Sequence, residues 1–421
     1  MNHFKTSVAA LVLLCFAFAS NATAENPALP VIPTNTFNIT KYGGVGDGKT
    51  LNTVAIQKTI DTAAAAGGGI VLIPEGKFLT GPFTLASSIN LHLDKGATIA
   101  ISDDMKNHPV TNNRYQDCVT ASDAHDVAIS GPGTIDGQGQ AWWTAFEADK
   151  NMTHRPYMIT ISKCTRVLVT GVTLCNSPMF HLVPRNCTDV TIKGITIKSP
   201  SNAHNTDGID PSGWNYLITD CVIDCGDDNI AVKPNTARKP GNKNYTITNC
   251  KFLHGHGMSI GSATEGGIED LRVSNCMFDS TDAGIRIKTL RGKGGVLQNL
   301  IYENLTMKNV KYAIRIIDYY PERNAPKDPS TEKTEPVNDK TPINKHIIIR
   351  NVTATDSPNA GQIWGLPEAP ITDVTLSNVT ISAKNGMQIN YAKGIRFIDS
   401  KINVESGKPL ITYSAEVTGL E

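Results

Sequence analysis

The sequence predicts an all-β protein, a parallel β-helix, and three observations support this fold class. Short stretches of alternating apolar and polar residues, such as 167–174 and 190–197, recur along most of the chain and are typical of half-buried strands. A small or polar residue interrupts each stretch, usually at a period in the mid to high twenties of residues. This period leaves no room for crossover helices, so successive coils must pair in parallel. The interrupting residues are Gly171, Gly194, Asp220, Asn249, Asn275, Asn304, Asn351 and Asn378.

The first 24 residues have the composition of a secretory signal peptide. Lys5 precedes an apolar run from Val8 to Phe18, and the small residues Ala22 to Ala24 suit cleavage after Ala24. A membrane anchor is the disfavoured alternative, because the run is shorter than the ~20 residues of a spanning helix. We therefore expect an exported protein, extracellular or periplasmic, whose mature part, 25–421, forms a single domain that grows by adding coils.

The charge of the chain limits its partners. It has 39 basic and 39 acidic side chains and no basic run, so composition gives no electrostatic reason to expect nucleic acid or a membrane surface as partner. Attraction for an acidic substrate must therefore be local. We expect the protein to act as a monomer.

Eight of the nine cysteines follow the predicted leader, which in an exported protein raises the possibility of disulfides. Cys221, Cys250 and Cys276, however, each follow the interrupting residue of a repeat, as a column of small buried side chains would. We favour free, stacked thiols, and the pairings Cys221 with Cys225 or Cys164 with Cys187 remain open alternatives. No cysteine or histidine cluster has the spacing of a metal site.

Three segments outside the repeats have their own signals. Residues 52–66 carry one apolar face and end at three glycines, which predicts a helix that caps the N-terminal end of the coil. Trp142 and Trp143 follow a tight turn; we favour packing against the coil over stacking on a sugar. Residues 319–345 are rich in proline, lysine and glutamate and predict a surface loop that either walls one end of a cleft or is idle.

Four clusters of reactive side chains recur at about one repeat each: 205–210, 225–229, 255–262 and 286–288. Neighbouring strands lie ~4.8 Å apart, so residues one coil apart in sequence meet at one surface site. Asp207, Asp227 and Asp228 should then lie close together, and mutual repulsion should raise one of their pKa values. A proton donor beside a base is what cleavage of a glycosidic bond requires.

Two other interpretations of the clusters stay open. Three aspartates could bind Ca²⁺, as in an eliminase that cleaves uronates, although His256 and the pair Arg286 and Lys288 already supply cations. The residues could also form an ion-pair network on a non-catalytic, polysaccharide-binding β-helix. Arg286 and Lys288 alternate along a strand and point the same way, which suits a substrate carboxylate.

The motifs N-T-D, G-D-D, G-H-G-M-S-I-G-S and R-I-K, in this order, resemble the four signatures of glycoside hydrolase family 28, the polygalacturonases. The resemblance extends to F-N-I-T-K-Y-G-G-V-G-D-G near the start, to I-D-G-Q-G-Q-A-W-W and to N-S-P-M-F-H, and so covers nearly the whole mature chain. It implies a right-handed parallel β-helix that hydrolyses α-1,4-galacturonosyl bonds of polygalacturonate with inversion, without a metal or another cofactor.

Carried over residue by residue, the resemblance implies Asp227 as general acid, with Asp207 and Asp228 holding and activating the water. His256 would tune the acid pair. Among the substrate-binding positions are Asn205, from the first motif, and Arg286 and Lys288, which would bind the galacturonate carboxylate; a family tyrosine corresponds to Tyr319 or Tyr320. Asn229 stands where many eukaryotic members have cysteine, which removes a familiar disulfide.

The mode of cleavage depends on loops that close the cleft, and the sequence favours internal cleavage. Exo-acting cleavage by a galacturonosidase of the same family is the alternative, and a pectate lyase-like enzyme is a more distant one. His256 together with the R-I-K pair disfavours relatives that cleave rhamnogalacturonan.

Overall fold

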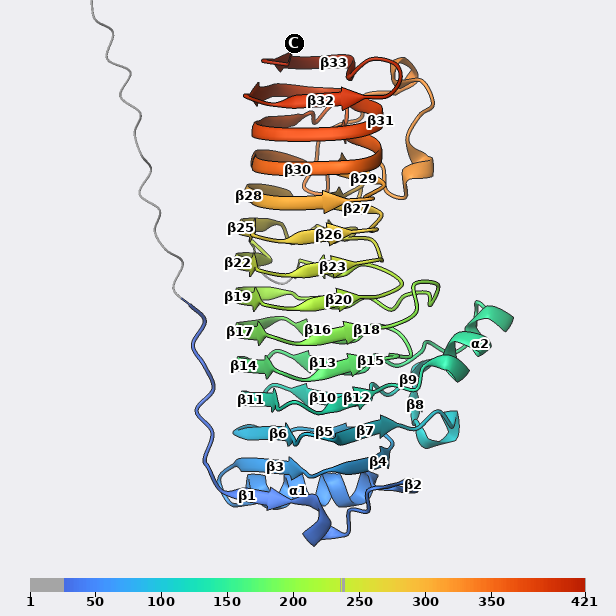
Figure 1. Cartoon of the computed structure of the whole chain (residues 1–421), viewed down its shortest axis with the longest axis vertical. Helices are drawn as coiled ribbons and strands as arrows, with labels where there is room; N and C mark the ends of the chain where they lie inside the picture. The colour runs from blue at the N-terminus through green and yellow to red at the C-terminus, as the bar shows by residue number, and fades with distance from the viewer. Residues whose placement is uncertain (1–25, 235, 237–238, 421) are drawn as a thin grey trace, which may run out of the picture.

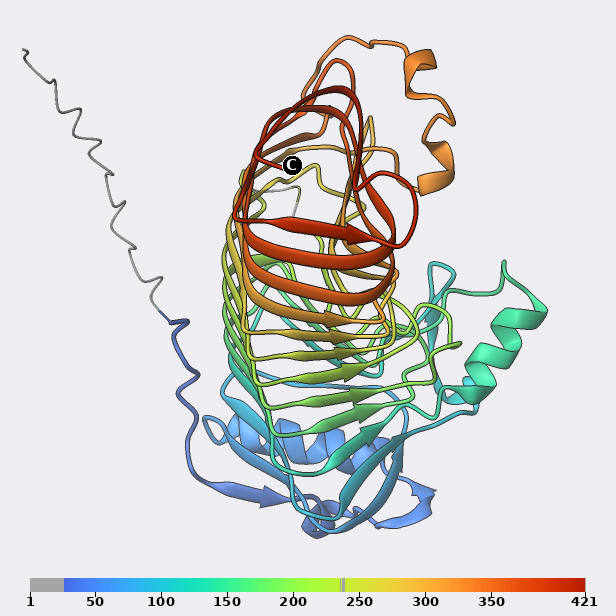
Figure 2. The same cartoon turned by 45° about the horizontal axis from the view of Figure 1, so that its top comes forward.

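The computed structural model describes residues 26–234, 236 and 239–420, and it shows a parallel β-helix (Figures 1 and 2). The coils stack along one axis from the blue N-terminal end to the red C-terminal end. The fold class predicted from the repeats is confirmed, and its right-handed winding is what parallel crossovers of twisted strands favour. The predicted leader lies outside the described residues, among which no helix has the length and apolarity that a membrane crossing requires.

Each coil contributes strands to three columns, and the strands of one column pair in parallel. The first column contains β1 (Thr36–Asn38), β3 (Gly69–Ile73), β6 (Ile89–Leu93), β11 (His125–Ser130), β14 (Thr165–Thr170), β17 (Cys187–Lys193), β19 (Gly213–Thr219), β22 (Asn242–Thr248), β25 (Ile268–Ser274) and the first part of β28 (Val296–Lys308). The second column contains β2 (Asp47–Leu51), β4 (Gly76–Thr80), β7 (Ala97–Ile101), β12 (Thr134–Asp136), β15 (Thr173–Cys175), β18 (Thr196–Lys198), β20 (Val222–Asp224), β23 (Lys251–Leu253), β26 (Met277–Asp279) and the end of β28.

The third column carries the candidate site. It contains β5 (Phe83–Thr84), β10 (Val119–Ser122), β13 (Ile159–Ser162), β16 (Leu182–Arg185), β21 (Ile230–Val232), β24 (Met258–Gly261), β27 (Ala283–Lys288) and β29 (Tyr312–Ile317). Ile209 bridges Leu182 and Ile230, which keeps the column continuous between β16 and β21. The long strands β30 (Ile343–Trp364) and β31 (Ile371–Ile398) extend the columns, and β32 (Lys401–Val404) and β33 (Leu410–Thr418) end the coil.

The interior is a continuous apolar core. At each inward-facing position of a column, every coil contributes one residue. In the third column Ile230, Met258, Ile285 and Ile314 are in register and fully buried, so each coil covers the core residues of the next. Burying apolar surface in this way is the main favourable term in folding. The alternation in the sequence therefore reports which residues face inward.

The residues that interrupt the strands adopt left-handed backbone conformations, as the turn between the first two columns requires. Asn304, Asn351 and Asn378 have φ values of 54°, 54° and 52°, which asparagine tolerates better than most side chains. The amide of each donates to the asparagine of the preceding coil at 2.9 Å, beginning with Asn304 and Asn275. The asparagine side chains thus connect the turns of successive coils.

All eight described cysteines carry free thiols, as the sequence favours. Cys221, Cys250 and Cys276 are buried in adjacent coils, and each thiol donates to the carbonyl oxygen two residues earlier. The alternative pairing of Cys164 with Cys187 is not formed, although the two residues neighbour one another in adjacent coils.

The predicted cap is confirmed as helix α1 (Thr53–Ala65), which buries Ile56, Ile60 and Ala63 over the first coils. A second helix, α2 (Gln140–Ala148), was not predicted, and the two tryptophans lie on it. Trp142 is fully buried between the rings of His108 and Tyr115, whereas Trp143 is partly exposed. The packing interpretation is confirmed for Trp142, and Trp143 also contacts the coil, because its Nε1 donates to the carbonyl oxygen of Ser177.

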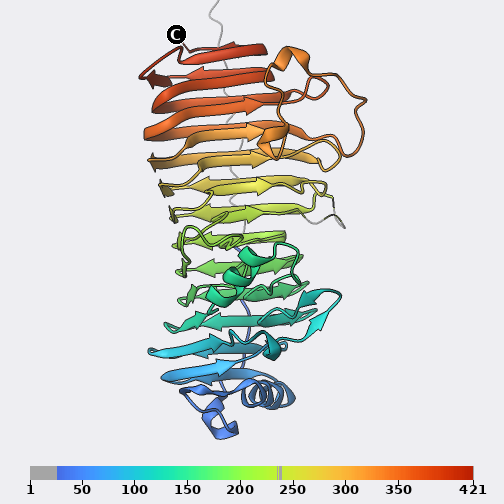
Figure 3. The same cartoon turned by 90° about the vertical axis from the view of Figure 1, so that its right-hand side faces the viewer.

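Short segments complete the chain: the hairpin β8 (Val110–Thr111) and β9 (Arg114–Tyr115), and the 3-10 turns η1 (Ile39–Tyr42), η2 (Met105–Asn107), η3 (Glu322–Asn324) and η4 (Pro329–Thr331). In Figure 1, α2 and the orange loop 319–345 protrude to the right at different heights. In Figure 3, which faces that side, α2 lies in front of the coils and the loop extends beyond their right edge. Arg291 fixes the loop by bonding Glu332 within it and Glu368 beyond it. The predicted surface loop is thus ordered against the coil.

Candidate active site

The four clusters meet on the outer face of the third column. Asp207 precedes the bridging residue Ile209, Asp228 precedes β21, His256 precedes β24, and Arg286 and Lys288 lie on β27. Arg286 is in register with Ser259, and Lys288 with Gly261, so both cations lie one coil beyond β24 and two coils beyond β21. Clusters that lie about one repeat apart in the sequence are therefore neighbours in space, as predicted.

Asp228 is the centre of the cluster, with a side chain only 3% exposed. Lys288 Nζ lies 2.6 Å from its Oδ2, and Arg286 Nη1 lies 3.2 Å from its Oδ1. Ser259 Oγ donates to the same Oδ1 at 2.8 Å. Burial acts to raise the pKa of Asp228, but the charges of Lys288, Arg286 and His256 outweigh it and hold the pKa well below its usual range. Asp228 is therefore an ionised carboxylate.

Asp227 and His256 form a second pair at the mouth of the cluster. His256 Nδ1 lies 2.9 Å from Asp227 Oδ1 and 3.7 Å from Asp228 Oδ1. Burial acts to lower the pKa of His256, yet its hydrogen bonds to the two carboxylates raise it to about 10. Burial acts to raise the pKa of Asp227, and the hydrogen bond from His256 outweighs it, so this pKa is lowered. In the free protein the proton of the pair resides on the imidazole.

Among Asp207, Asp227 and Asp228, Asp207 is the aspartate whose pKa is raised. The sequence predicted a raised pKa for one of these three residues. Burial is the main cause, and the negative charge of Asp210 is the next. Lys233 opposes both, because its Nζ lies 3.3 Å from Asp207 Oδ2 and also bonds Asp210 Oδ1. Burial raises the pKa of Asp210 to about 6. One ammonium group thus serves two buried carboxyl groups.

Sequence reasoning missed Lys233 and the role of Asp210. Asp210 stands inside the first motif, and Lys233 directly follows β21, five residues after Asp228. Continuing the alternation of β21 by one residue would have placed Lys233 on the outer face. Buried carboxyl groups need a counter-charge, so a lysine at that point was the available signal.

Asn205 links the cluster to a buried arginine. Its Nδ2 donates to Asp227 Oδ2 at 3.4 Å, and its Oδ1 accepts from Arg155 Nη2 at 2.9 Å. Asn229 fixes the turn below it by accepting from the backbone N–H of Gly257 and donating to the carbonyl oxygen of Ile223. The residue that departs from the family pattern therefore has a structural role here.

The two candidate tyrosines lie in different surroundings. Tyr319 is 5% exposed and packs against Trp364 in a small second core. Tyr320 turns towards the cluster, and Lys288 Nζ lies 5.2 Å from the centre of its ring. Tyr320 is thus the tyrosine beside the reactive residues.

The loop 319–345 returns a carboxylate to the cluster. Glu322 Oε1 lies 3.1 Å from Arg286 Nη2 and 3.3 Å from Arg315 Nη1. Arg315 is in register with Arg286 one coil further along, and Gln362 and Gln388 continue this outward column. A cationic and amide-bearing track therefore extends from the aspartates towards the C-terminal coils.

Asp227, Asp228 and His256 are also the residues that could hold a metal ion, since their ligand atoms lie within 4.8 Å of one another. Both oxygens of Asp228, however, already bond cations, Lys288 and Arg286. These side chains supply the positive charge that a calcium ion would supply, so the cluster is less suited to a hard cation, whereas Arg286 and Lys288 suit a substrate carboxylate.

The comparisons with known proteins agree with this geometry. Residues 67–402 match the model of glycosyl hydrolases family 28. An endo-polygalacturonase from Pectobacterium carotovorum is 33% identical over 362 residues, covering 80% of this chain and 86% of that protein, and an exopolygalacturonase from Zea mays is 31% identical over 389 residues, covering 88% and 90%.

Solved structures show the same fold. The hyperthermoactive exopolygalacturonase from Thermotoga maritima superposes with a TM-score of 0.74 at 26% identity, covering 89% of this chain and 94% of that one. The polygalacturonase from Erwinia carotovora gives 0.69 at 27% identity, covering 95% and 100%. The family resemblance of the four motifs is therefore confirmed: the chain belongs to glycosyl hydrolases family 28 and is a glycoside hydrolase of the polygalacturonase type.

Proposed function

We propose that this protein is secreted and hydrolyses α-1,4-galacturonosyl bonds of polygalacturonate, the backbone of pectin, with inversion and by internal cleavage. The observation that carries the proposal is the arrangement of Asp228, bonded by Arg286 and Lys288, directly beside the Asp227–His256 pair. An acid, a base and a site for a substrate carboxylate lie together, which suits glycosidic cleavage of a uronate chain.

Asp227 would protonate the leaving oxygen. A sugar that covers the pair removes water, and loss of water raises the pKa of a carboxyl group and lowers that of an imidazole. Both changes move the proton from His256 to Asp227 across the 2.9 Å contact between them. Substrate binding would thus convert the ion pair into a neutral acid poised for transfer.

Asp207 and Asp228 would hold and activate the attacking water on the opposite face of the sugar, which gives inversion. Arg286 and Lys288 each combine a bond to Asp228 with further donors, and these would take the galacturonate carboxylate. Tyr320 would line the same subsite beside Lys288.

Internal cleavage requires that the polymer extend past the reactive residues in both directions. Asn205 lies on one side of Asp227, and the column of Arg315, Gln362 and Gln388 continues on the other. Exo-acting cleavage is the second candidate, since relatives named for both modes match the chain. The leader 1–24, the single domain 25–421 and a monomeric state complete the proposal.

The test follows the viscosity of polygalacturonate against the reducing ends released by the mature protein, with and without a chelator. A steep loss of viscosity at few new ends, unchanged by the chelator, is the expected result. Reducing ends that rise while viscosity stays high would indicate exo-cleavage. Unsaturated, ultraviolet-absorbing ends that depend on calcium would overturn hydrolysis in favour of elimination.

Replacing Lys233 with methionine is expected to shift the acid limb of the pH–rate profile. Without the ammonium group the pKa of Asp207 rises further, so Asp207 ionises at higher pH and activity on the acid side is lost first. The profile of kcat/KM against pH measures the shift. Lys233→Arg keeps the positive charge and should give a profile close to that of the unaltered protein. The control Lys243→Met, which removes partly exposed ion pairs with Glu269 and Asp270, should leave the profile unchanged. An unshifted Lys233→Met profile would contradict the assignment.

Replacing Glu322 with glutamine is expected to lower KM for polygalacturonate about 2- to 5-fold, the size of a partly exposed ion pair. Its carboxylate now engages Arg286, where the substrate carboxylate would bind. Initial rates at a series of substrate concentrations measure the change. Glu332→Gln, in the same loop but bonded to Arg291, is the matched control. A rise in KM would instead mean that Glu322 positions Arg286 for the substrate.

A further inference from the structure

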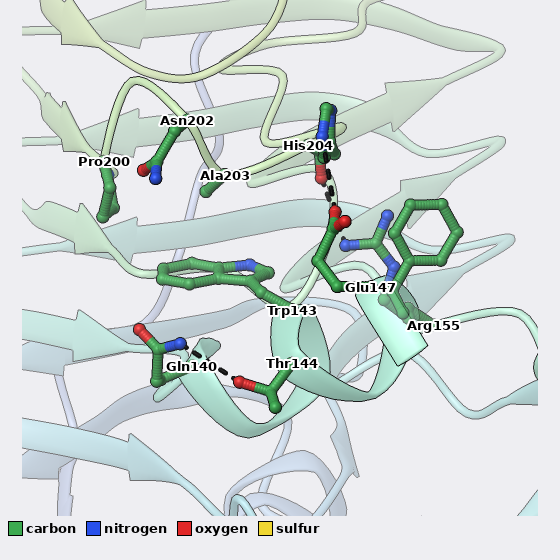
Figure 4. A pocket seen from close by; sticks show the side chains of 10 residues that line it. Gln140, Trp143, Thr144, Glu147, Arg155, Pro200, Asn202, Ala203 and His204 are labelled. Carbon is green, nitrogen blue, oxygen red and sulfur yellow. Dashed lines mark hydrogen bonds and ion pairs between the residues drawn. The ribbon is translucent and has the colours of Figure 1, made fainter. Parts of the chain in front are cut away.

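A pocket of about 470 Å³ opens between α2 and residues 200–204, beside the reactive cluster (Figure 4). Its wall includes Trp143, Phe146 and Glu147 from α2, and Arg155 and His204 from neighbouring segments. The proposed roles of Asp207, Asp227, Asp228, His256, Arg286 and Lys288 leave this pocket unused. Its lining combines aromatic faces, the buried cation Arg155 and the carboxylate of Glu147, which is paired with Lys150 and His204.

Trp143 is held with one ring face towards this pocket. Its Nε1 donates to the carbonyl oxygen of Ser177 at 3.0 Å, which fixes the plane of the indole. Figure 4 shows the ring edge-on, with Gln140 and Thr144 on one side and Asn202 and Ala203 on the other. Trp142, its neighbour in the sequence, is fully buried, so it is Trp142 and not Trp143 that fills the space under α2. A flat, fixed and partly exposed aromatic ring is suited to stacking on the apolar face of a sugar.

Arg155 brings a positive charge to the same pocket. It is 3% exposed, and its Nη1 donates to the carbonyl oxygens of Pro178 at 2.9 Å and His204 at 3.1 Å. Its Nη2 donates to the side chain of Asn205. All three acceptors are neutral oxygens. The nearby carboxylate of Glu147 acts on Arg155 through its charge, but its ion-pair partners are Lys150 at 2.7 Å and His204 at 3.3 Å. An anionic ligand in the pocket would meet the guanidinium charge of Arg155.

The pocket is joined to the reaction centre by two hydrogen bonds. Arg155 donates to Asn205 at 2.9 Å, and Asn205 donates to Asp227 Oδ2 at 3.4 Å. Arg286 and Lys288 lie on β27, on the C-terminal side of Asp227, whereas α2 belongs to the N-terminal side. A chain crossing Asp227 would therefore reach the pocket on one side and the two cations on the other.

We propose that this pocket binds one uronic acid unit of the polysaccharide, stacked on Trp143 and attracted by Arg155, on the side of the cleaved bond opposite Arg286 and Lys288. This inference rests on the proposed hydrolysis of polygalacturonate. Under this inference Trp143 contacts the substrate, and α2 forms one wall of a subsite.

The test compares Trp143→Ala and Trp143→Phe with the unaltered protein on polygalacturonate and trigalacturonate. The alanine variant is expected to raise KM on the order of 10-fold with kcat nearly unchanged, because stacking contributes to binding of the chain. The phenylalanine variant should recover most of the affinity. Tyr413→Ala, which removes a partly exposed aromatic ring at the far end of the coil, is the matched control and should leave KM unaltered.

Binding without turnover separates this inference from the proposed function. In an Asp227→Asn background, calorimetry should detect binding of trigalacturonate and weaker binding after Trp143→Ala. Equal affinity with and without Trp143 in a protein that cleaves polygalacturonate would overturn the subsite and leave the function standing. Equal affinity for the uncharged trigalactose would overturn recognition of the substrate carboxylates, both by Arg155 and by Arg286 and Lys288. A protein that binds trigalacturonate through Trp143 but releases no ends would retain the subsite and overturn the hydrolysis.

Discussion

Replacing Asp227 with asparagine is expected to lower kcat on polygalacturonate by about 10²–10⁴-fold, the usual contribution of a general acid. The amide is nearly the same size and still accepts from His256, but it cannot deliver a proton to the leaving oxygen. The Asp227 side chain is 21% exposed, so the fold should tolerate the change. Reducing-end release measures kcat, and circular dichroism with thermal melting checks that the coil is intact.

The chain offers a matched control for this variant. Asp224 Oδ1 lies 2.9 Å from His254 Nδ1, the same atoms and separation as in the Asp227–His256 pair, but the side chains of His254 and Asp224 are more exposed, at 54% and 35%. Asp224→Asn should therefore leave kcat unchanged. If Asp227→Asn retained most of the activity at every pH, Asp227 would not be the acid, and the proton would have to come from another group.

Replacing Asp228 with asparagine is expected to abolish activity and to lower the free energy of unfolding by about 3–5 kcal/mol. Arg286 and Lys288, whose side chains are 8% and 7% exposed, would remain buried without their shared carboxylate. Because the pKa of Asp228 is lowered in the folded protein, its stabilisation is complete above the ordinary value of 3.8 and is lost as pH falls below that value. The loss of unfolding free energy in Asp228→Asn should therefore be seen at neutral pH and become smaller in acid.

Two further variants decide whether the lost stability comes from unpaired buried charge. Combining Asp228→Asn with Lys288→Met removes one stranded cation and should recover part of the stability without recovering activity. Asp373→Asn, which breaks an exposed pair with Arg396, should cost only about 0–1 kcal/mol. Urea unfolding of all four proteins gives the comparison. A loss at Asp228 no larger than that at Asp373 would show that the cluster does not depend on its charge balance.

Most residues of the reaction centre could be predicted from the sequence, because one sequence repeat corresponds to one turn of the coil. One residue of each repeat occupies the same place in successive turns, so 20 to 30 residues along the chain become one strand spacing. Asp207, Asp228, His256, Arg286 and Lys288 were placed together on that ground alone. The asparagine ladder and the stacked thiols follow from the same periodicity.

The tertiary structure decided what the period does not encode. Lys233 lies beyond the end of β21, and only the packing of two buried carboxyl groups shows why an ammonium group is there. Glu322 reaches Arg286 from a loop without periodicity, and that loop brings Tyr320 rather than Tyr319 to the site. The two tryptophans are adjacent in sequence, but a short helix turns one into the core and the other towards the pocket.

Repeat spacing thus determined the fold class, the shared face and the acidic centre of this family 28 glycosidase from the amino acids alone. Charge balance among buried groups and the course of the non-repeating segments were left to the tertiary structure. The physical reason is that a strand's alternation fixes which way a side chain points, whereas its partner depends on contacts made by segments with no fixed register.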